Sequence, residues 1–247
     1  MSQQTTDDIA LSIVLPTFNE RENVIQLLSE LEQSLTVNYE AIVVDDDSPD
    51  LTWQAVERFA STRNNVRLLR RMNNRGLTGA LNEGLGLARG RLLMWMDADL
   101  SMPPAKIPEL LLAIEGGADA AVGSRYVRGG GDARAVTFLL TARLMLGRVL
   151  SIANGWLLNC RFRDWSSGFI VVKREFLEGH RLSGNYGEYF IALIVYLIKR
   201  RKANVVEVPY IQGPRKPREP EVIIGFWESV RRGCKYMGMV LRQCFVF

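Results

Sequence analysis

The sequence predicts an α/β protein with an open, mostly parallel β-sheet flanked by helices. In the first half of the chain, short apolar runs alternate with amphipathic segments at the spacing of strand–helix–strand crossovers. The apolar runs are continuous, as expected for strands that are covered on both faces. Acidic residues follow three of these runs, and ligands of such sheets bind beyond the carboxyl ends of the strands.

Strands and helices alternate from residue 11 to residue 101. Residues 11–18 (LSIVLPTF) form a short β-rich run. The segment 22–35 is predicted to be a helix because its apolar residues share one face: Val24, Leu27, Leu28, Leu31 and Leu35. The elements that follow are a strand at 39–50, a helix at 52–61, a strand at 65–71, a helix at 77–89 and a strand at 91–101.

The pattern becomes less regular after Ala121. The segments expected there are a strand leading into 123–131 (GSRYVRGGG), an apolar and basic stretch at 137–159, a strand at 170–176, a helix at 188–202 and a strand at 205–210. Residues 221–247 predict a basic amphipathic helix, because apolar residues recur at helical intervals and most charges lie between them.

The expected organisation is a disordered N-terminus (1–10), one folded domain (11–212) and a basic loop with a C-terminal amphipathic helix (213–247). Within the domain, 137–159 is expected to form amphipathic helices that face a membrane or pack on the fold. No apolar run reaches the ~18–20 residues of a membrane-spanning helix, and the N-terminus lacks the features of a secretory signal. We therefore expect a chain that does not cross a bilayer.

Composition narrows the class of partner. With 47% hydrophobic and 23% charged residues, the 247-residue chain is typical of folded globular proteins. Three scattered cysteines exclude a disulfide framework and favour a reducing, cytosolic setting. The net charge is +4, and basic residues concentrate in 123–163 and 213–247, which favours an anionic partner: phosphate, nucleic acid or a lipid surface. Because no nucleic-acid-binding motif is present, no nucleic-acid partner is expected.

The stretch LLMWMDADLS (92–101) carries Asp97 and Asp99 directly after an apolar run. Two carboxylates one residue apart repel each other, and a bound cation or the amides of a helix N-terminus can offset that cost. Mg²⁺ and Mn²⁺ prefer oxygen ligands, commonly one or two carboxylates completed by water and substrate phosphates. The alternative is structural: Asp99 caps the helix that begins near PPAKIPELL, and Asp97 is solvated.

Two other predicted strands end in polar residues, at 16–20 (PTFNE) and 45–50 (DDDSPD). Their carboxylates and the aromatic ring of Phe18 would suit a nucleotide held between them. The alternative is local turn chemistry, in which Asn19 or Asp50 opens a helix.

Eight short stretches together resemble the inverting GT-A glycosyltransferases of family 2, in particular the dolichol- and polyprenol-phosphate mannose synthases. They are LPTFNERENV, VVDDDSPD, RGLTGALNEGL, ARG, MDADLSMPP, GSRYVRGGG, RDWSSGF and VVEVPY, in this order over residues 11–210. The resemblance implies a GT-A fold for 11–212, a nucleotide-sugar donor such as GDP-mannose, Mg²⁺ or Mn²⁺ as cofactor, and a polyprenyl-phosphate acceptor. Because no QxxRW-type word is present, transfer of a single sugar is expected.

The resemblance also implies roles for individual residues. Those that match the nucleotide pocket are Pro16, Phe18, Glu20 and Asp46. Those that match the metal and diphosphate site are Asp97 and Asp99, with Ser101 as a further candidate ligand. Those that match the acceptor-phosphate site are Arg125, Arg143 and Ser167, and Arg215 matches a donor-side residue in the loop after the VPY strand. Asp99, Arg125 and Arg143 are the expected catalytic residues.

The expected chemistry needs no general base. A lipid monophosphate is already anionic at neutral pH, so its oxygen needs positioning and not deprotonation. Arginine keeps its charge and holds phosphate through paired N–H groups, which suits Arg125 and Arg143. His180 is the only histidine, and we expect it to be a loop residue without a chemical role.

Two stretches depart from the family pattern. Ser101 stands where the family often has glutamine or another polar residue that reaches the metal, so metal binding there is weaker or mediated by water. The loop GPRKPREPEV keeps the positive charge of Arg215, Lys216 and Arg218, but Glu221 replaces the closing lysine.

The expected location is the cytoplasmic face of a membrane, where the protein is peripheral and the amphipathic segments lie in the interface. A core helix or a dimer surface is the alternative for each segment, and a separate membrane subunit is a further candidate partner. Two functional alternatives remain open: a UDP-glucose-dependent polyprenyl-phosphate glucosyltransferase, and a membrane-docking GT-A-like protein without turnover.

Overall fold

The computed structural model describes residues 9–133, 151, 153–158, 160–184, 187–215, 236 and 238–240. Three expectations fall mainly outside these described residues: the disordered N-terminus, the amphipathic helices at 137–159 and the C-terminal amphipathic helix. Arg143 also lies outside them.

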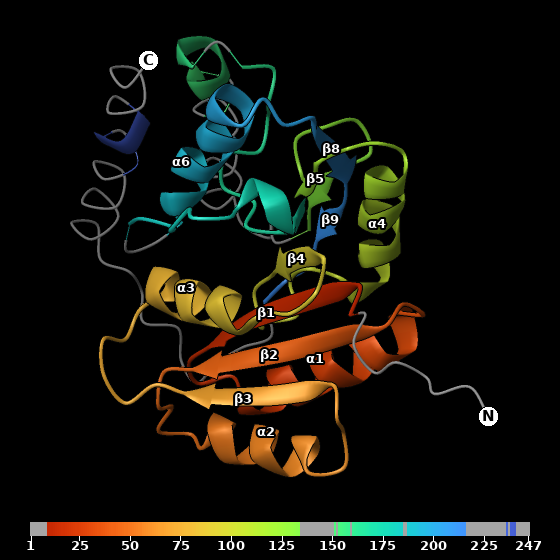
Figure 1. The fold of residues 1–247 in the computed structure, drawn as a ribbon, viewed down its shortest axis with the longest axis vertical. Coiled ribbons are helices and arrows are strands. Elements are labelled where there is room, and N and C mark those ends of the chain that lie inside the picture. The colour runs from red at the N-terminus through yellow and green to blue at the C-terminus, as the bar shows by residue number, and fades with distance from the viewer. Residues whose placement is uncertain are drawn as a thin grey trace.

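A seven-stranded sheet forms the centre of the fold (Figure 1). Its strands are β1 (Leu11–Thr17), β2 (Tyr39–Asp45), β3 (Val66–Arg70), β4 (Leu92–Trp95), β5 (Ala120–Ser124), β7 (Ile170–Lys173) and β8 (Val205–Pro209). They are arranged in the order β3-β2-β1-β4-β7-β5-β8. All neighbours are parallel except β7, which runs antiparallel to both β4 and β5. The predicted α/β fold with a mostly parallel sheet is confirmed.

The antiparallel strand β7 is the main departure from the expected topology. The chain leaves β5 at its carboxyl end and comes back to the same end before β7 begins. The backbone N–H of Gly123, in β5, donates there to the carbonyl of Phe169 at 2.8 Å. Entering the sheet at that edge, the chain has to run in the opposite direction. The strand expected at 170–176 is shorter than predicted, since Arg174–Phe176 form a helical turn (η2).

Two small strands complete the described sheet structure. β6 (Gly131–Asp132) and β9 (Ile211–Gln212) pair in parallel next to the end of β8. β6 follows β5 in the chain and β9 follows β8, so both strands lie beyond the carboxyl ends of strands of the main sheet.

Helices cover both faces of the sheet. They are α1 (Arg21–Ser34), α2 (Thr52–Ala60), α3 (Leu77–Leu87), α4 (Ile107–Glu115), preceded by a helical turn η1 (Pro104–Lys106), and α6 (Tyr189–Val195), which continues into a π-helical turn η3 (Tyr196–Arg200). In Figure 1, α1 and α2 lie on one side of the sheet and α3 on the other. None of the helices in the described ranges has the length and apolar character needed to span a membrane.

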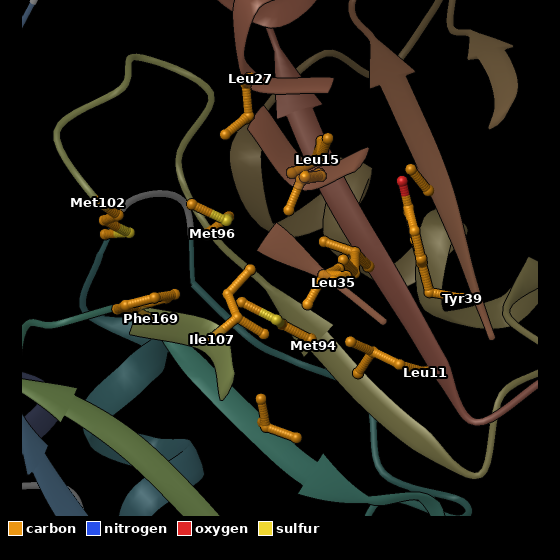
Figure 2. Packing of buried hydrophobic residues seen from close by; sticks show 14 of the residues in the cluster. Leu11, Leu15, Leu27, Leu35, Tyr39, Met94, Met96, Met102, Ile107 and Phe169 are labelled. Carbon is orange, nitrogen blue, oxygen red and sulfur yellow. The ribbon is translucent and has the colours of Figure 1, made fainter. Parts of the chain in front are cut away.

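Successive residues of a strand pack on opposite sides, as the two-residue period of a β-strand requires. Ile13 and Leu15 of β1 join the apolar cluster beneath α1 and α4, and Val14 joins the cluster beneath α3 and α6. Figure 2 shows the first cluster, with Leu15 and Met94 from the sheet and Ile107 from α4. Burial on both faces explains why the strand sequences are continuously apolar.

The predicted apolar face of the first helix is confirmed. Its five apolar residues are all at most 9% exposed, although the last of them lies just beyond α1: Val24, Leu27, Leu28, Leu31 and Leu35.

Two glycines of α3 are predicted to respond oppositely to alanine. A Cβ atom at Gly84 would lie 2.4 Å from Val14 Cγ1 in the sheet, whereas a Cβ at Gly86 would meet no heavy atom within 4 Å. Gly84→Ala should lower the free energy of unfolding by about 1–3 kcal/mol through overpacking. Gly86→Ala should raise it by about 0.5–1 kcal/mol, because alanine is the better helix former.

Urea denaturation of both variants and the wild type measures this difference. Equal effects of the two substitutions would contradict the close packing of α3 on β1.

Candidate active site

The candidate site lies at the carboxyl edge of the sheet, where β2, β1 and β4 are neighbours. The stretches that follow these strands are 45–50, 16–20 and 97–101. The first two are joined directly, since the backbone N–H of Asn19 donates to the Ser48 hydroxyl at 2.9 Å. The third is near enough for the charge of Glu20 to act on Asp97. The fold thus brings the three predicted stretches together.

Two carboxylates of 45–50 have structural roles. Asp45 is fully buried and accepts hydrogen bonds from the hydroxyls of Thr17 (2.9 Å) and Ser48 (2.6 Å). Asp50 accepts the first backbone N–H of α1 at 3.1 Å and the first of α2 at 2.9 Å. The local alternative considered for Asp50, that it opens a helix, is therefore what the structure contains.

Asp46 faces the loop 72–76. Its Oδ1 accepts a hydrogen bond from Arg71 Nη1 and its Oδ2 accepts one from the Gly76 backbone N–H, both at 2.6 Å. Burial raises the pKa of Asp46, and the Gly76 N–H and the Arg71 charge oppose that rise. Asp46 thus fixes the loop beside the predicted nucleotide pocket.

Arg71 is a site residue that the sequence did not single out. It is 4% exposed, and besides Asp46 it contacts Glu83 Oε1 (3.0 Å) and the carbonyls of Gly76 (3.3 Å) and Asn74. The only sequence signal is its position directly after an apolar strand. Its partners lie directly after β2, on α3 and in the loop between β3 and α3, so the spacing along the chain could not reveal the ion pair.

Asp99 holds the turn that follows β4. Its Oδ1 accepts the backbone N–H of Ser101 at 3.0 Å, across Leu100, which has a φ of 62°. Its Oδ2 pairs with Arg215 Nε at 2.8 Å. The next helical turn begins only at Pro104, so Asp99 caps this turn and not the helix.

Asp97 is the member of the pair whose charged form is destabilised. Desolvation and the neighbouring charge of Asp99 raise the pKa of Asp97 to about 6, although Arg215 and Arg125 act in the opposite direction. Among the described residues, no hydrogen bond to the Asp97 carboxylate is found. The positive charges of the described residues therefore do not fully compensate the Asp97 carboxylate.

This donor set fits a divalent cation completed by ligands from outside the protein. Two carboxylate oxygens suit Mg²⁺ or Mn²⁺, which often take their remaining ligands from water and phosphates. Within the described part of the chain, no group of three or more His, Cys, Asp or Glu side chains is placed to hold a metal. Ser101 is fully buried, and its hydroxyl accepts a hydrogen bond from Gln212 at 3.2 Å.

Arg125 lies in a buried ion pair. Its Nε and Nη2 donate to the two oxygens of Asp164 at 2.8 and 2.6 Å, and Asp164 is fully buried. Nη2 also donates to the Ser166 hydroxyl (2.8 Å), and Nη1 donates to Gln212 Oε1 (2.9 Å). These bonds engage four of the five guanidinium N–H groups.

Ser167 lies in the same turn and is 5% exposed. Its hydroxyl donates to the carbonyl of Gly123 and accepts the backbone N–H of Phe169 at 3.2 Å. It joins the end of β5 to the start of β7, next to Arg125.

The remaining predicted donor-side residues differ in accessibility. Pro16 belongs to β1, Phe18 is 41% exposed directly after it, and Glu20 is 2% exposed and accepts Asn23 Nδ2 at 2.7 Å. Asn19 Oδ1 is buried without a hydrogen-bond partner among the described residues. A buried acceptor without a partner is unfavourable, which makes this position a candidate contact for a ligand that donates a hydrogen bond.

Sequence comparison gives a consistent set of relatives. Residues 12–176 match the family described as "Glycosyl transferase family 2". A "Dolichol-phosphate mannosyltransferase" of Pyrococcus furiosus is 36% identical over 94% of this chain, which spans 66% of that relative's length. A "Polyprenol monophosphomannose synthase" of Mycolicibacterium smegmatis is 34% identical over 80% of this chain and 75% of the relative.

The fold is also similar to solved structures. Glucosyl-3-phosphoglycerate synthase from Mycobacterium tuberculosis, in complex with Mn²⁺, UDP and glucosyl-3-phosphoglycerate, superposes with a TM-score of 0.69 at 19% identity. The match covers 95% of this chain and 80% of that one. A complex of the same enzyme with Mg²⁺ and UDP gives a TM-score of 0.71 at 18% identity.

Removing the Arg71 guanidinium should destabilise the protein and release the loop 72–76. Arg71→Leu leaves the Asp46 carboxylate without its charged partner, which should lower the free energy of unfolding by about 3 kcal/mol. Arg75→Ala is the matched control, because Arg75 pairs at 2.8 Å with the more exposed Asp47 and should leave stability essentially unchanged.

Chemical denaturation and the rate of limited proteolysis in 72–76 measure the two effects. If Arg71→Leu were as stable as Arg75→Ala, the structural role of the Asp46–Arg71 pair would be wrong.

Proposed function

Because the chain belongs to glycosyl transferase family 2, we propose that it transfers one mannosyl group from GDP-mannose to a polyprenyl or dolichyl monophosphate. The observation that carries this proposal is the charge cluster after β4, in which Asp99, Arg215 and Arg125 all act on Asp97. Carboxylates for a metal and fixed guanidinium groups for phosphates occur together there. The names of the two relatives support the sugar and the acceptor.

The proposed reaction inverts the configuration at the anomeric carbon. The bond between that carbon and the diphosphate oxygen breaks, and GDP leaves with the electron pair. An anionic oxygen of the lipid phosphate forms the new bond from the opposite side. No proton has to be removed from the acceptor, so the proposed reaction assigns no role to His180, whose ring is stacked on Tyr196 with centroids 3.8 Å apart.

On the donor side, the nucleotide would bind at the carboxyl ends of β1 and β2. Phe18 is 41% exposed, and Asn19 Oδ1 has no hydrogen-bond partner among the described residues. Pro16 and Glu20 flank these groups, and Asp46 shapes the adjoining loop through its bonds to Arg71 and Gly76.

The diphosphate is assigned to the end of β4. Asp97 and Asp99 would hold Mg²⁺ or Mn²⁺, and that ion supplies charge neutralisation for the departing diphosphate. Arg215 pairs with Asp99 at 2.8 Å and has a side chain 55% exposed, which supports a role in which it would contact the same phosphates. Ser101 contributes through the backbone of the turn, because its N–H is bonded to Asp99.

On the acceptor side, Arg125 has one N–H group outside the four hydrogen bonds that it makes to described residues, and its guanidinium group is held in place by Asp164. We assign the lipid phosphate to this guanidinium and to the turn that contains Ser167. Arg143 is proposed as the second phosphate-holding arginine and lies outside the described residues.

We further propose that the protein works peripherally on the cytoplasmic face of a membrane. Trp156 is 85% exposed and Leu157 is 56% exposed, within the stretch expected to be amphipathic. Such side chains suit the headgroup region of a bilayer. A separate membrane subunit that anchors the protein is compatible with the same surface.

The direct test is transfer of radiolabelled sugar from a panel of GDP- and UDP-sugars to a polyprenyl phosphate in detergent. We expect label in the lipid phase from GDP-mannose with Mg²⁺ or Mn²⁺, and none when EDTA is present. Label from UDP-glucose and not from GDP-mannose would contradict the proposed donor and support a polyprenyl-phosphate glucosyltransferase. No lipid label from any donor, while the protein still binds a nucleotide, would support the form without turnover.

Asp99→Asn should abolish transfer and keep the fold. Asparagine preserves the hydrogen bond to the Ser101 N–H but removes the charge that would hold the metal, so transfer should fall by at least about 10²-fold. Glu109→Gln is the matched control, since Glu109 is an exposed residue in the first turn of α4 and pairs with Lys106 at 2.7 Å. Turnover near that of the wild type in Asp99→Asn would refute the metal assignment, and circular dichroism would verify folding.

A further inference from the structure

Gln212 is a buried polar residue between the two sides of the candidate site. It is the last residue of β9 and is 3% exposed. Its amide nitrogen donates to the Ser101 hydroxyl at 3.2 Å, and its amide oxygen accepts Arg125 Nη1 at 2.9 Å. One side chain therefore contacts both the turn after β4 and the buried ion pair.

The orientation of this amide follows from its partners. A guanidinium group can only donate hydrogen bonds, so the amide oxygen has to face Arg125. The NH₂ group then faces Ser101, whose hydroxyl oxygen accepts. A buried amide is costly unless it is hydrogen-bonded, and the Gln212 amide is engaged at both ends. If the amide were rotated by 180°, its NH₂ group would face an N–H group of Arg125, and two donors would meet. The amide therefore keeps one orientation.

On the Ser101 side, Gln212 belongs to a segment that is attached to the turn at three points. The Gly213 N–H donates to the Ser101 carbonyl at 2.9 Å, the Gln212 amide bonds the Ser101 hydroxyl, and Arg215 pairs with Asp99. Since the Ser101 N–H is bonded to Asp99, the position of Ser101 determines how the Asp99 carboxylate is oriented.

On the Arg125 side, Gln212 contacts a rigid unit. Asp164 holds the Arg125 guanidinium through both of its oxygens. The backbone N–H groups of Arg163 and Asp164 in turn donate to Glu207 of β8, each at 2.9 Å. This unit is anchored to the sheet independently of the turn after β4.

We propose that Gln212 is a positioning residue that couples the donor-side turn at Asp97 to Ser101 with the acceptor-side pair Arg125–Asp164. A continuous hydrogen-bonded path runs from Asp99 through Ser101, Gln212 and Arg125 to Asp164. The inference rests on the proposed function. In-line transfer requires donor and acceptor to be held in a fixed relation, and small displacements have large effects on rate.

The test compares Gln212→Met with Ser101→Ala. Methionine has a similar length but cannot form either hydrogen bond, so both sides of the site should be affected. We expect the Kd of GDP with Mn²⁺ and the KM for polyprenyl phosphate each to rise about tenfold. Ser101→Ala removes only the donor-side link, so the Kd should rise and the acceptor KM should stay unchanged.

The double variant and a control make the comparison quantitative. Adding Ser101→Ala to Gln212→Met should weaken GDP–Mn²⁺ binding no further, since the link is already broken. Gln33→Met, at an exposed position of α1, should change neither constant. Changes confined to one constant in Gln212→Met, or a loss of stability with both constants unchanged, would overturn the coupling.

Hydrogen–deuterium exchange gives a readout that does not depend on turnover. In Gln212→Met, exchange should accelerate both in 97–101 and in 163–167, whereas in Ser101→Ala it should accelerate only in 97–101. Acceleration in one segment or neither in Gln212→Met would overturn the inference. A wild-type protein that transfers no sugar would refute the proposed function, and the exchange experiment would still decide whether Gln212 couples the two segments.

Discussion

The repulsion between Asp97 and Asp99 at the end of a buried strand is the constraint around which the polar part of this structure is arranged. Desolvation and mutual charge raise the pKa of Asp97 to about 6, so the pair is unfavourable without nearby cations. Arg215 lies directly on Asp99, and Arg125 acts on Asp97 from a greater distance. Neither neutralises the pair fully, which leaves the site electrostatically suited to a divalent ion.

The two arginines that act on Asp97 and Asp99 lie in the second half of the chain, whereas the two carboxylates lie in the first half. Arg125 follows β5, and Arg215 follows β9, whereas Asp97 and Asp99 follow β4. The antiparallel strand β7 lies between β4 and β5 and begins at the carboxyl edge of the sheet, so the segment before it, which contains Asp164, lies at that edge. This departure from a purely parallel sheet therefore places the partner of Arg125 where the first half ends in acids.

Three arginines in the described part of the site differ in how firmly they are held. Arg71 and Arg125 are 4% and 8% exposed, and each makes several hydrogen bonds to carboxylates and carbonyls. Arg215 has a 55% exposed side chain and one ion pair. Buried guanidinium groups provide fixed positive charge, while an exposed one can change partner when an anionic ligand binds. In the proposed reaction, Arg71 and Arg125 shape the pocket and Arg215 follows the diphosphate.

The sequence by itself determined the sheet, the order of its first elements and the three polar stretches at one edge. Apolar periodicity and the βαβ rule depend on neighbouring residues, and they correctly predicted α1 and its buried leucines such as Leu27. Family words identified Asp97, Asp99, Arg125 and Arg215 as candidates. Tertiary structure alone decided the direction of β7, the Asp46–Arg71 pair and the contact of Gln212 with Ser101, 111 residues away in the chain. In each of these features, segments far apart in the chain form hydrogen bonds with each other, and the local pattern of one sequence does not show which distant segments will meet.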